Sequence, residues 1–220
     1  MKLGWKDLVN LGICLIPAVY LYSIWTELPE SVPLHWNASG EIDRYGSKNE
    51  LAWTALALPL FTYVLMLVIP ILDPKKQIKY MGAKYDSLKM LLAVLMSGLA
   101  VFIVHSAKNT EIMSSGMLFT LIGFLFLGLG NYFQTIKPNY FIGIRTPWTL
   151  ENEEVWKRTH KLGGRLWVVG GLLIILLSFI VDMQDITPIF IGIILVMSLI
   201  PVIYSYMQFR KISSNSTQGE

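Results

Sequence analysis

The stretch LAWTALALPLFTYVLMLVIPIL, residues Leu51–Leu72, contains no Asp, Glu, Lys or Arg. A helix of about 20 apolar residues rises ~1.5 Å per residue and crosses the ~30 Å hydrocarbon core of a bilayer. Further charge-free stretches of similar character follow or precede it: Leu8–Thr26, Met90–Ala107, Ile112–Ile136, Leu166–Val181 and Ile186–Phe209. Leu166–Val181 is short for a span, so we extend it back to Gly163, with Arg165 reaching toward the headgroups.

The pattern therefore predicts an all-α, polytopic membrane helix bundle with six transmembrane helices. The expected spans are about 8–26, 51–72, 90–107, 112–136, 163–181 and 186–209, within a single integral membrane domain of residues 1–212. Residues 213–220 are expected to form a disordered cytoplasmic tail. The composition agrees, because 54% of the residues are hydrophobic and 15% are charged, against about 25% charged in soluble proteins.

The basic residues predict the orientation, because cytoplasmic loops of membrane proteins are enriched in Lys and Arg. Of the 18 Lys and Arg, all but Arg44, Lys48 and Lys108 lie on one side of the predicted spans. We therefore expect both termini in the cytoplasm and the loop Glu27–Glu50 outside. The net charge of +3 reflects this asymmetry, so direct nucleic-acid binding is not expected.

The outer loop Glu27–Glu50 is one candidate recognition site. Its prolines and glycines indicate an extended entry and a tight turn, and its candidate ligand-binding residues are His35, Trp36, Asn37, Gly40, Asp43 and Lys48. Two interpretations stay open: these residues bind a ligand, or they order the loop against the membrane interface, where Trp is enriched. A metal site is not expected, because one imidazole without paired ligands is a poor set. The lone Cys14 offers no disulfide or Cys-based zinc site within the chain.

The inner segment Tyr140–His160 is the second candidate site. Its candidate partner-binding residues are Asn139, Gly143, Arg145, Thr146, Trp148, Thr149, Trp156 and His160. The Arg145 guanidinium suits a carboxylate, a phosphate or a helix C-terminus, so this loop either binds a cytoplasmic partner or ties helix ends together.

A short cytoplasmic interfacial helix is predicted near 150–162. Thr149 or Asn152 is expected to cap its N-terminus, and the pairs Glu153–Lys157 and Glu154–Arg158 have the i,i+4 spacing of helical ion pairs. Gly163-Gly164 is expected to end the helix, and Trp156 and His160 share one face.

Small and polar residues in the fourth span point to helix packing. Gly123, Gly128 and Gly130 allow close approach of helices in lipid. Asn131 and Gln134 are expected to bond a neighbouring helix or to face a cytoplasmic vestibule, because an unpaired amide in hydrocarbon is costly.

The two loops resemble conserved regions of the SdpI family of bacterial six-helix membrane proteins. The outer match runs through Leu28-Pro29, Val32-Pro33-Leu34-His35-Trp36-Asn37, Gly40, Asp43 and Gly46-Ser47-Lys48, and the inner match runs through Asn139, Ile142-Gly143-Ile144-Arg145-Thr146-Pro147-Trp148 and Trp156 to His160. The resemblance implies a multi-pass protein of the bacterial cell membrane that gives immunity to a secreted toxin peptide. It also implies signalling, in which the protein holds a cytoplasmic repressor at the membrane.

The leading hypothesis is therefore a non-enzymatic immunity or sensor protein without a cofactor, with membrane lipid, a secreted peptide and a cytoplasmic repressor as partners. A small transporter or exporter is the alternative, although such proteins usually carry ionisable groups near the bilayer midplane. A membrane-embedded enzyme using His160, Glu154 and Arg145 is the third class. It lacks a nucleophile motif or a metal motif to accompany these residues.

Overall fold

Long helices dominate the computed structural model, which describes residues 4–37, 42–74, 76–109 and 116–217. The elements are α1 (Trp5–Ser23), β1 (Ser31–Trp36), β2 (Ile42–Ser47), α2 (Lys48–Leu72), α3 (Ala83–Lys108), α4 (Met117–Phe133), α5 (Pro147–Glu151), α6 (Glu153–Leu177) and α7 (Met183–Thr217). Short 3-10 turns lie at Trp25–Glu27 and Lys79–Met81. The predicted all-α membrane bundle is confirmed, with one antiparallel hairpin, β1-β2, added to it.

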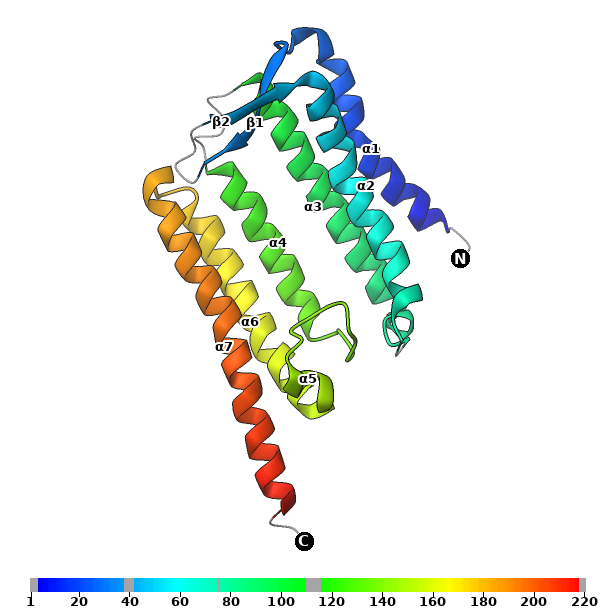
Figure 1. Ribbon diagram of the computed structural model, residues 1–220, viewed down its shortest axis with the longest axis vertical. Coiled ribbons are helices and arrows are strands. Elements are labelled where there is room, and N and C mark those ends of the chain that lie inside the picture. The colour runs from blue at the N-terminus through cyan, green and yellow to red at the C-terminus, as the bar shows by residue number, and fades with distance from the viewer. Residues whose placement is uncertain (1–3, 38–41, 75, 110–115, 218–220) are drawn as a thin grey trace.

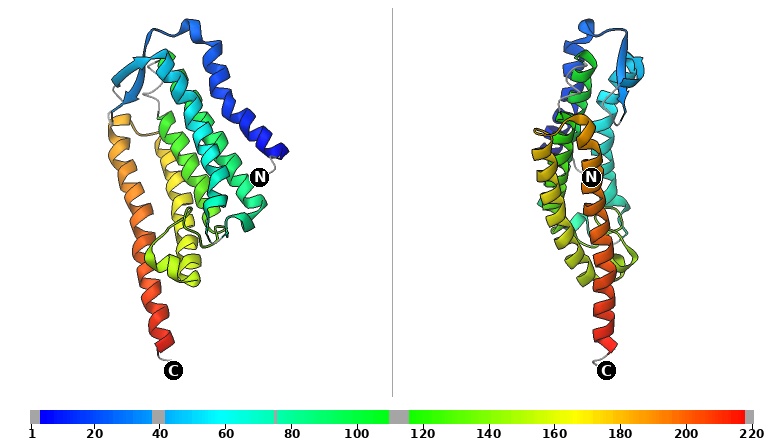
Figure 2. Two further views of the ribbon diagram at one scale, coloured as in Figure 1. Left: turned by 45° about the vertical axis from the view of Figure 1, so that its right-hand side comes forward. Right: turned by 90° about the vertical axis from the view of Figure 1, so that its left-hand side faces the viewer.

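The long helices form two groups, α1–α3 and α4–α6–α7, which meet mainly where α3 lies beside α4 (Figure 1). The chain reverses direction with each successive long helix, so the hairpin lies at one end of the bundle and both described chain ends point away from it (Figure 2). This alternation is what six crossings would require. Following the predicted orientation, we call the hairpin end outer and the opposite end inner.

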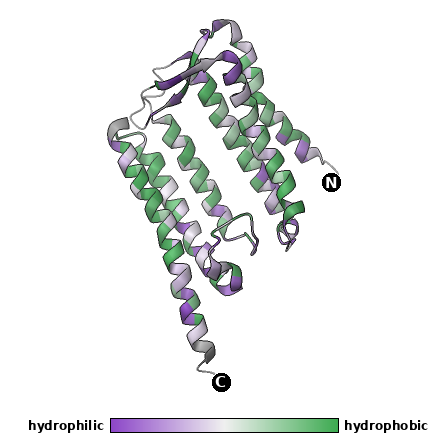
Figure 3. Cartoon of the chain, viewed as in Figure 1, coloured by the Kyte–Doolittle hydropathy of each residue, from purple (hydrophilic) through white to green (hydrophobic). Residues whose placement is uncertain are grey.

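Within the described residues, four helical segments are long and apolar enough to cross a membrane: Lys48–Leu72, Ala83–Lys108, Glu153–Leu177 and Asp185–Ser214. The helix α4 is apolar but shorter, and part of its predicted span, residues 112–115, lies outside the described residues. Hydrophobic residues fill the middle of the bundle, whereas the hairpin, the inner loops and the end of α7 are more hydrophilic (Figure 3). The helix α7 continues to Thr217, and the last part of the predicted tail, residues 218–220, is not described.

Glycines let α4 and α6 touch backbone to backbone. A Cβ on Gly130 would lie 2.8 Å from the Gly164 carbonyl oxygen, and a Cβ on Gly164 would lie 2.7 Å from that of Gly130. Seven residues away on each helix, Gly123 and Gly171 face each other in the same way. A Cβ on Gly123 would lie 2.9 Å from the Gly171 carbonyl oxygen, and a Cβ on Gly171 would lie 2.7 Å from that of Gly123. The predicted packing role of Gly123 and Gly130 is confirmed, since small residues allow this approach in lipid.

The predicted end of the inner helix at Gly163-Gly164 is wrong. A break occurs instead at Asn152, where α5 ends and α6 begins, and α6 then runs without interruption from Glu153 to Leu177. Both glycines lie inside α6 and pack against other parts of the protein. Gly164 packs on Gly130 of α4. Gly163 packs against the Ile144 side chain, which would lie only 2.4 Å from a Cβ at this position. Tertiary packing therefore overrides the weak helix propensity of glycine.

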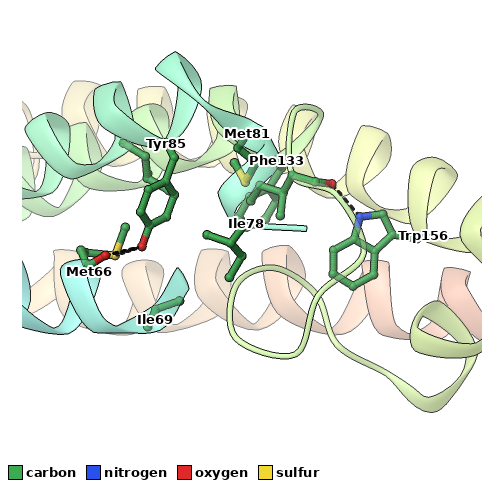
Figure 4. Close-up of a cluster of buried hydrophobic side chains, with 9 residues drawn as sticks. Met66, Ile69, Ile78, Met81, Tyr85, Phe133 and Trp156 are labelled. Carbon is green, nitrogen blue, oxygen red and sulfur yellow. Dashed lines mark hydrogen bonds between the residues drawn. The ribbon is translucent and has the colours of Figure 1, made fainter. Parts of the chain in front are cut away.

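A buried hydrophobic cluster joins the two helix groups at the inner end. Met66 and Ile69 come from α2, Tyr85 from α3, Phe133 from α4 and Trp156 from α6, and Figure 4 shows their side chains around Ile78 and Met81. The Tyr85 hydroxyl donates to the Met66 carbonyl at 2.6 Å. The cluster fixes the inner loops on both groups of helices.

The hairpin is held by a separate cluster at the outer end. Val32 of β1 is fully buried with Leu28, Leu51 and Val104, which belong to the turn before the hairpin, α2 and α3. Ser47 ends β2 and also caps α2, accepting a hydrogen bond from the Glu50 amide at 3.3 Å. The hairpin is thus a rigid continuation of the first helix group.

Candidate functional site

The segment 137–151, which we call the inner platform, follows α4 and packs against the first turns of α6 and against α7 near Ser205. Its first turn is built around Asn139, which is fully buried. The Asn139 side-chain amide donates to the carbonyls of Lys137 and Ile142, and its oxygen accepts from the amides of Phe141 and Ile142 at 2.8 Å each. Every hydrogen-bonding capacity of this side chain serves the loop itself.

The next turn requires Gly143. Its φ of +108° favours glycine, and a Cβ at this position would lie 2.4 Å from His160 Nε2 and 3.3 Å from Trp156 Cζ2. The backbone of the platform therefore lies directly against the side chains of α6.

His160 of α6 uses both ring nitrogens, Nε2 toward the platform and Nδ1 toward its own helix. The Ile144 amide donates to Nε2 at 2.9 Å, so Nε2 is an acceptor and the proton resides on Nδ1, which faces the Trp156 carbonyl at 2.9 Å. The imidazole stacks on the Trp156 ring with centroids 4.0 Å apart, and Trp156 Nε1 donates to the Ile136 carbonyl at 2.7 Å. The prediction that Trp156 and His160 share a face is confirmed.

Two threonines connect the platform to α7. Thr146 caps α5: its hydroxyl accepts from the Thr149 amide at 3.2 Å, and the Thr149 hydroxyl accepts from the Thr146 amide at 2.9 Å. The Thr146 hydroxyl also bonds that of Ser205 on α7 at 3.0 Å. Beside them, the rings of Trp148 and Tyr206 lie 5.0 Å apart.

Most of the predicted partner-binding side chains are therefore interior. Asn139, Thr146, Thr149, Trp156 and His160 are buried, whereas Arg145 is exposed and Trp148 is half-buried. The Arg145 guanidinium donates to the Tyr140 carbonyl, at the other end of the same turn. Arg145 is the residue of this set best placed to meet another molecule.

The beginning of α6 agrees with the sequence prediction. Asn152 is the N-cap, and its side chain accepts from the amides of Glu154 and Val155. The ion pairs Glu153–Lys157 at 3.1 Å and Glu154–Arg158 at 2.7 Å are present. Arg158 also donates to Gln208 of α7 at 3.0 Å, which adds a polar contact between the two helices.

At the outer end, the hairpin brings His35 and Asp43 together. Their side chains meet at 2.6 Å between Nδ1 and Oδ1, and both are exposed, like the neighbouring Arg44 and Tyr45. Arg44 lies 3.7 Å from Glu50 of α2. These residues form a polar outer surface of mixed charge.

The other predicted outer residues lie elsewhere on the hairpin. Lys48 is largely covered, pairs with Glu30 at 3.0 Å and lies over the Trp25 ring, so it stabilises the base of the hairpin. Trp36 pairs with Ile42 in the strand register, and Asn37 is half-buried directly after β1. Gly40 lies outside the described residues.

A buried charge network within α1–α3 was not predicted. Lys89 of α3 bonds Asp7 of α1 at 3.0 Å and Asp86 at 3.2 Å, and the Tyr63 hydroxyl of α2 donates to Asp7 at 2.7 Å. The sequence placed Lys89 just before the span 90–107, but α3 begins at Ala83 and carries it into the bundle. One sequence pattern could have indicated a buried polar group here: the spacing of Asp7, Asn10 and Cys14 puts three polar side chains on one face of the helix.

The geometry favours binding and packing over acid–base chemistry at the inner end. Both His160 nitrogens are already hydrogen-bonded in the interior, while Glu154 pairs with Arg158 at the surface. The described residues contain no group of three or more His, Cys, Asp or Glu side chains able to hold a metal ion.

Comparison with known proteins found a family match for the inner site and a relative similar along nearly the whole chain. Residues 135–205, which include the whole platform, match the SdpI/YfhL protein family. The chain is also 26% identical over 212 residues to the "Immunity protein SdpI" of Bacillus subtilis, across 96% of this chain and 99% of that protein. The chain is therefore similar to SdpI/YfhL proteins over residues 135–205 and to the Bacillus subtilis protein over nearly its whole length. It is a multi-pass bacterial membrane protein, as the resemblance implied.

Two further comparisons match shorter stretches of the chain. Residues 12–62, which contain the hairpin and most of α1, match a family described as a domain of unknown function, DUF1648. An uncharacterized protein of Archaeoglobus fulgidus is 46% identical over 48 residues, covering 21% of this chain and 26% of that protein. No solved structure matches the chain.

Proposed function

We propose that this chain is an integral membrane immunity protein that protects its cell against a secreted antimicrobial peptide. The observation that carries the proposal is the match to the Bacillus subtilis immunity protein over nearly the full length of both chains. A match confined to one pair of helices would indicate only similar packing in the membrane. The match to the Bacillus subtilis protein includes both the hairpin and the platform.

We assign first contact with the peptide to the exposed outer surface of the hairpin. His35, Asp43, Arg44 and Tyr45 are exposed there, on strands fixed to α2 and α3 by the buried Val32 cluster. A rigid surface of this kind binds with little ordering cost. Charges of both signs lie side by side on it, which suits a peptide with its own charged side chains.

The inner platform is proposed to report the state of the bundle to a cytoplasmic protein such as a repressor. Its buried residues connect α4, α6 and α7, so a shift of these helices would move the exposed Arg145. The hydrogen bonds of Asn139, His160 and the two threonines make these residues positioning groups for that surface.

Survival under peptide challenge tests the proposal. Cells that carry the chain should withstand at least one secreted membrane-active peptide that kills cells lacking it. The double substitution His35→Ala/Asp43→Ala should reduce protection while the protein stays in the membrane at wild-type amounts. Lys161→Ala, at an exposed inner position, serves as the matched control and should protect normally. Full protection by the hairpin variant would exclude this surface as the contact site.

A further inference from the structure

A cavity of about 680 Å³ lies at the inner end between the two helix groups. Gln77 and Lys84 line it from the first group, and Lys137, Glu151, Trp156 and Lys157 line it from the second. Its volume falls within the ~300–1,000 Å³ of small-ligand sites. The cavity therefore suits a small molecule or a headgroup better than a folded protein partner.

The walls of the cavity have two kinds of surface. One part continues the hydrophobic cluster of Figure 4, because Ile136 and Trp156 belong to both. The other part is polar, with Gln77, Gln134 and Thr135 beside the charged residues. A ligand that fills the cavity thus needs an apolar portion next to a polar group. Of the two roles expected for Gln134, a bond to a neighbouring helix or a place on a cytoplasmic vestibule, this position agrees with the second.

The charges favour an anion. Three lysines line the cavity, against the two carboxylates of Glu151 and Glu153. Glu153 is already paired with Lys157 at 3.1 Å. Lys84 and Lys137 form no ion pair with any other residue that the structure describes, and both are exposed. Each projects from a different helix group toward one shared space.

We propose that this cavity binds the phosphate of an anionic phospholipid headgroup, with Lys84 and Lys137 contacting it from the two helix groups. Lysine ammonium groups bind phosphate as point charges, and the cavity lies at the ends of helices apolar enough to cross a membrane, where headgroups are expected. Apolar atoms of Ile136, Leu150 and Trp156 lie beside the site for the glycerol and upper acyl region. A bound lipid would connect the α1–α3 group to the platform. This inference does not depend on the immunity proposal.

Lipid binding by the purified full-length chain tests the proposal. The protein is placed in nanodiscs of phosphatidylcholine that contain phosphatidylglycerol, and retained phosphatidylglycerol is counted by native mass spectrometry. Each basic residue near the surface is expected to contribute about five-fold to binding, so Lys84→Gln/Lys137→Gln should weaken it about 30-fold. The charge-retaining variant Lys84→Arg/Lys137→Arg should keep most of the binding.

The matched control removes two charges from the same side of the membrane. Lys161→Gln/Lys211→Gln alters exposed residues of α6 and α7 that do not line the cavity, and it should bind phosphatidylglycerol within about two-fold of the wild type. Circular dichroism of each variant shows whether the helices are retained. Equal losses in the two glutamine pairs would overturn the proposal, because they would show that only general surface charge attracts the lipid.

A second arm identifies the source of the phosphate. Glycerol 3-phosphate is added to the protein in nanodiscs of pure phosphatidylcholine, and binding is measured for the same variants. No binding in this arm, together with the Lys84- and Lys137-dependent lipid binding, supports the headgroup. Binding of glycerol 3-phosphate with the same lysine dependence would support the phosphate site and assign its ligand to the cytoplasm. No dependence on these lysines in either arm would overturn the site.

Discussion

Replacing Gly171 with alanine places a methyl group between α4 and α6 at one of their two backbone contacts. The added Cβ would lie 2.7 Å from the Gly123 carbonyl oxygen and 2.7 Å from the Leu127 amide nitrogen. Both obstructing atoms belong to the backbone, so no side chain can rotate away and the helices must separate. Overpacking of this kind costs about 1–3 kcal/mol, and the better helix propensity of alanine returns at most ~1 kcal/mol. We expect a net loss of about 1–2 kcal/mol in the free energy of unfolding.

The structure provides a matched control on α7. Gly192 also lies within a helix, but a Cβ there meets nothing within 4 Å. Gly192→Ala should therefore leave stability unchanged or raise it by up to ~1 kcal/mol. The assay is SDS titration of the protein in mixed micelles, followed by far-UV circular dichroism. The double variant Gly123→Ala/Gly171→Ala should lose less than the sum of its single losses, because one separation of the helices accommodates both methyl groups. Equal stability of Gly171→Ala and Gly192→Ala would refute the close contact.

Three further perturbations test other parts of the structure. Lys89→Ala leaves Asp7 without its buried partner and should lower the free energy of unfolding by about 3–5 kcal/mol. Lys6→Ala removes an exposed 3.5 Å pair with Asp86 and should lower it by less than ~1 kcal/mol. Denaturant titration compares the two variants, and similar losses would contradict the buried network. Gly143→Ala should displace His160 and speed exchange of the Ile144 amide, while Gly82→Ala, at φ +53° in open space, should strain its own turn and leave that amide protected. Thr149→Val should cost about 1–3 kcal/mol because the Thr146 amide and the Ile144 carbonyl lose a buried partner; an unchanged melting temperature would argue against that network.

Most of the long helices could be predicted from the sequence, because long runs without charged residues are typical of helices that cross a membrane. The helix Lys48–Leu72 agrees closely with the stretch Leu51–Leu72. The strands of the hairpin were not predicted, because their pairing is set by the buried Val32 contact with distant helices. The helix through Gly163-Gly164 was also missed, since its continuation depends on α4.

The candidate sites divide in a similar way. Local chemistry correctly predicted the two i,i+4 ion pairs and the shared face of Trp156 and His160, and Asn152 was one of the two residues predicted to cap the helix. The contact of Gly143 with His160 joins residues far apart along the chain, so no local pattern reveals it. The same holds for Asp7 and Lys89, which lie on different helices, α1 and α3. Long-range contacts thus decide which residues of a motif are interior and which meet another molecule.

The decisive measurement of immunity is the survival of cells that carry or lack this chain under challenge with a panel of secreted membrane-active peptides. We expect the chain to protect against at least one peptide, and His35→Ala/Asp43→Ala to reduce this protection at unchanged protein amounts. Identical sensitivity of the two strains to every peptide in the panel would contradict the immunity proposal.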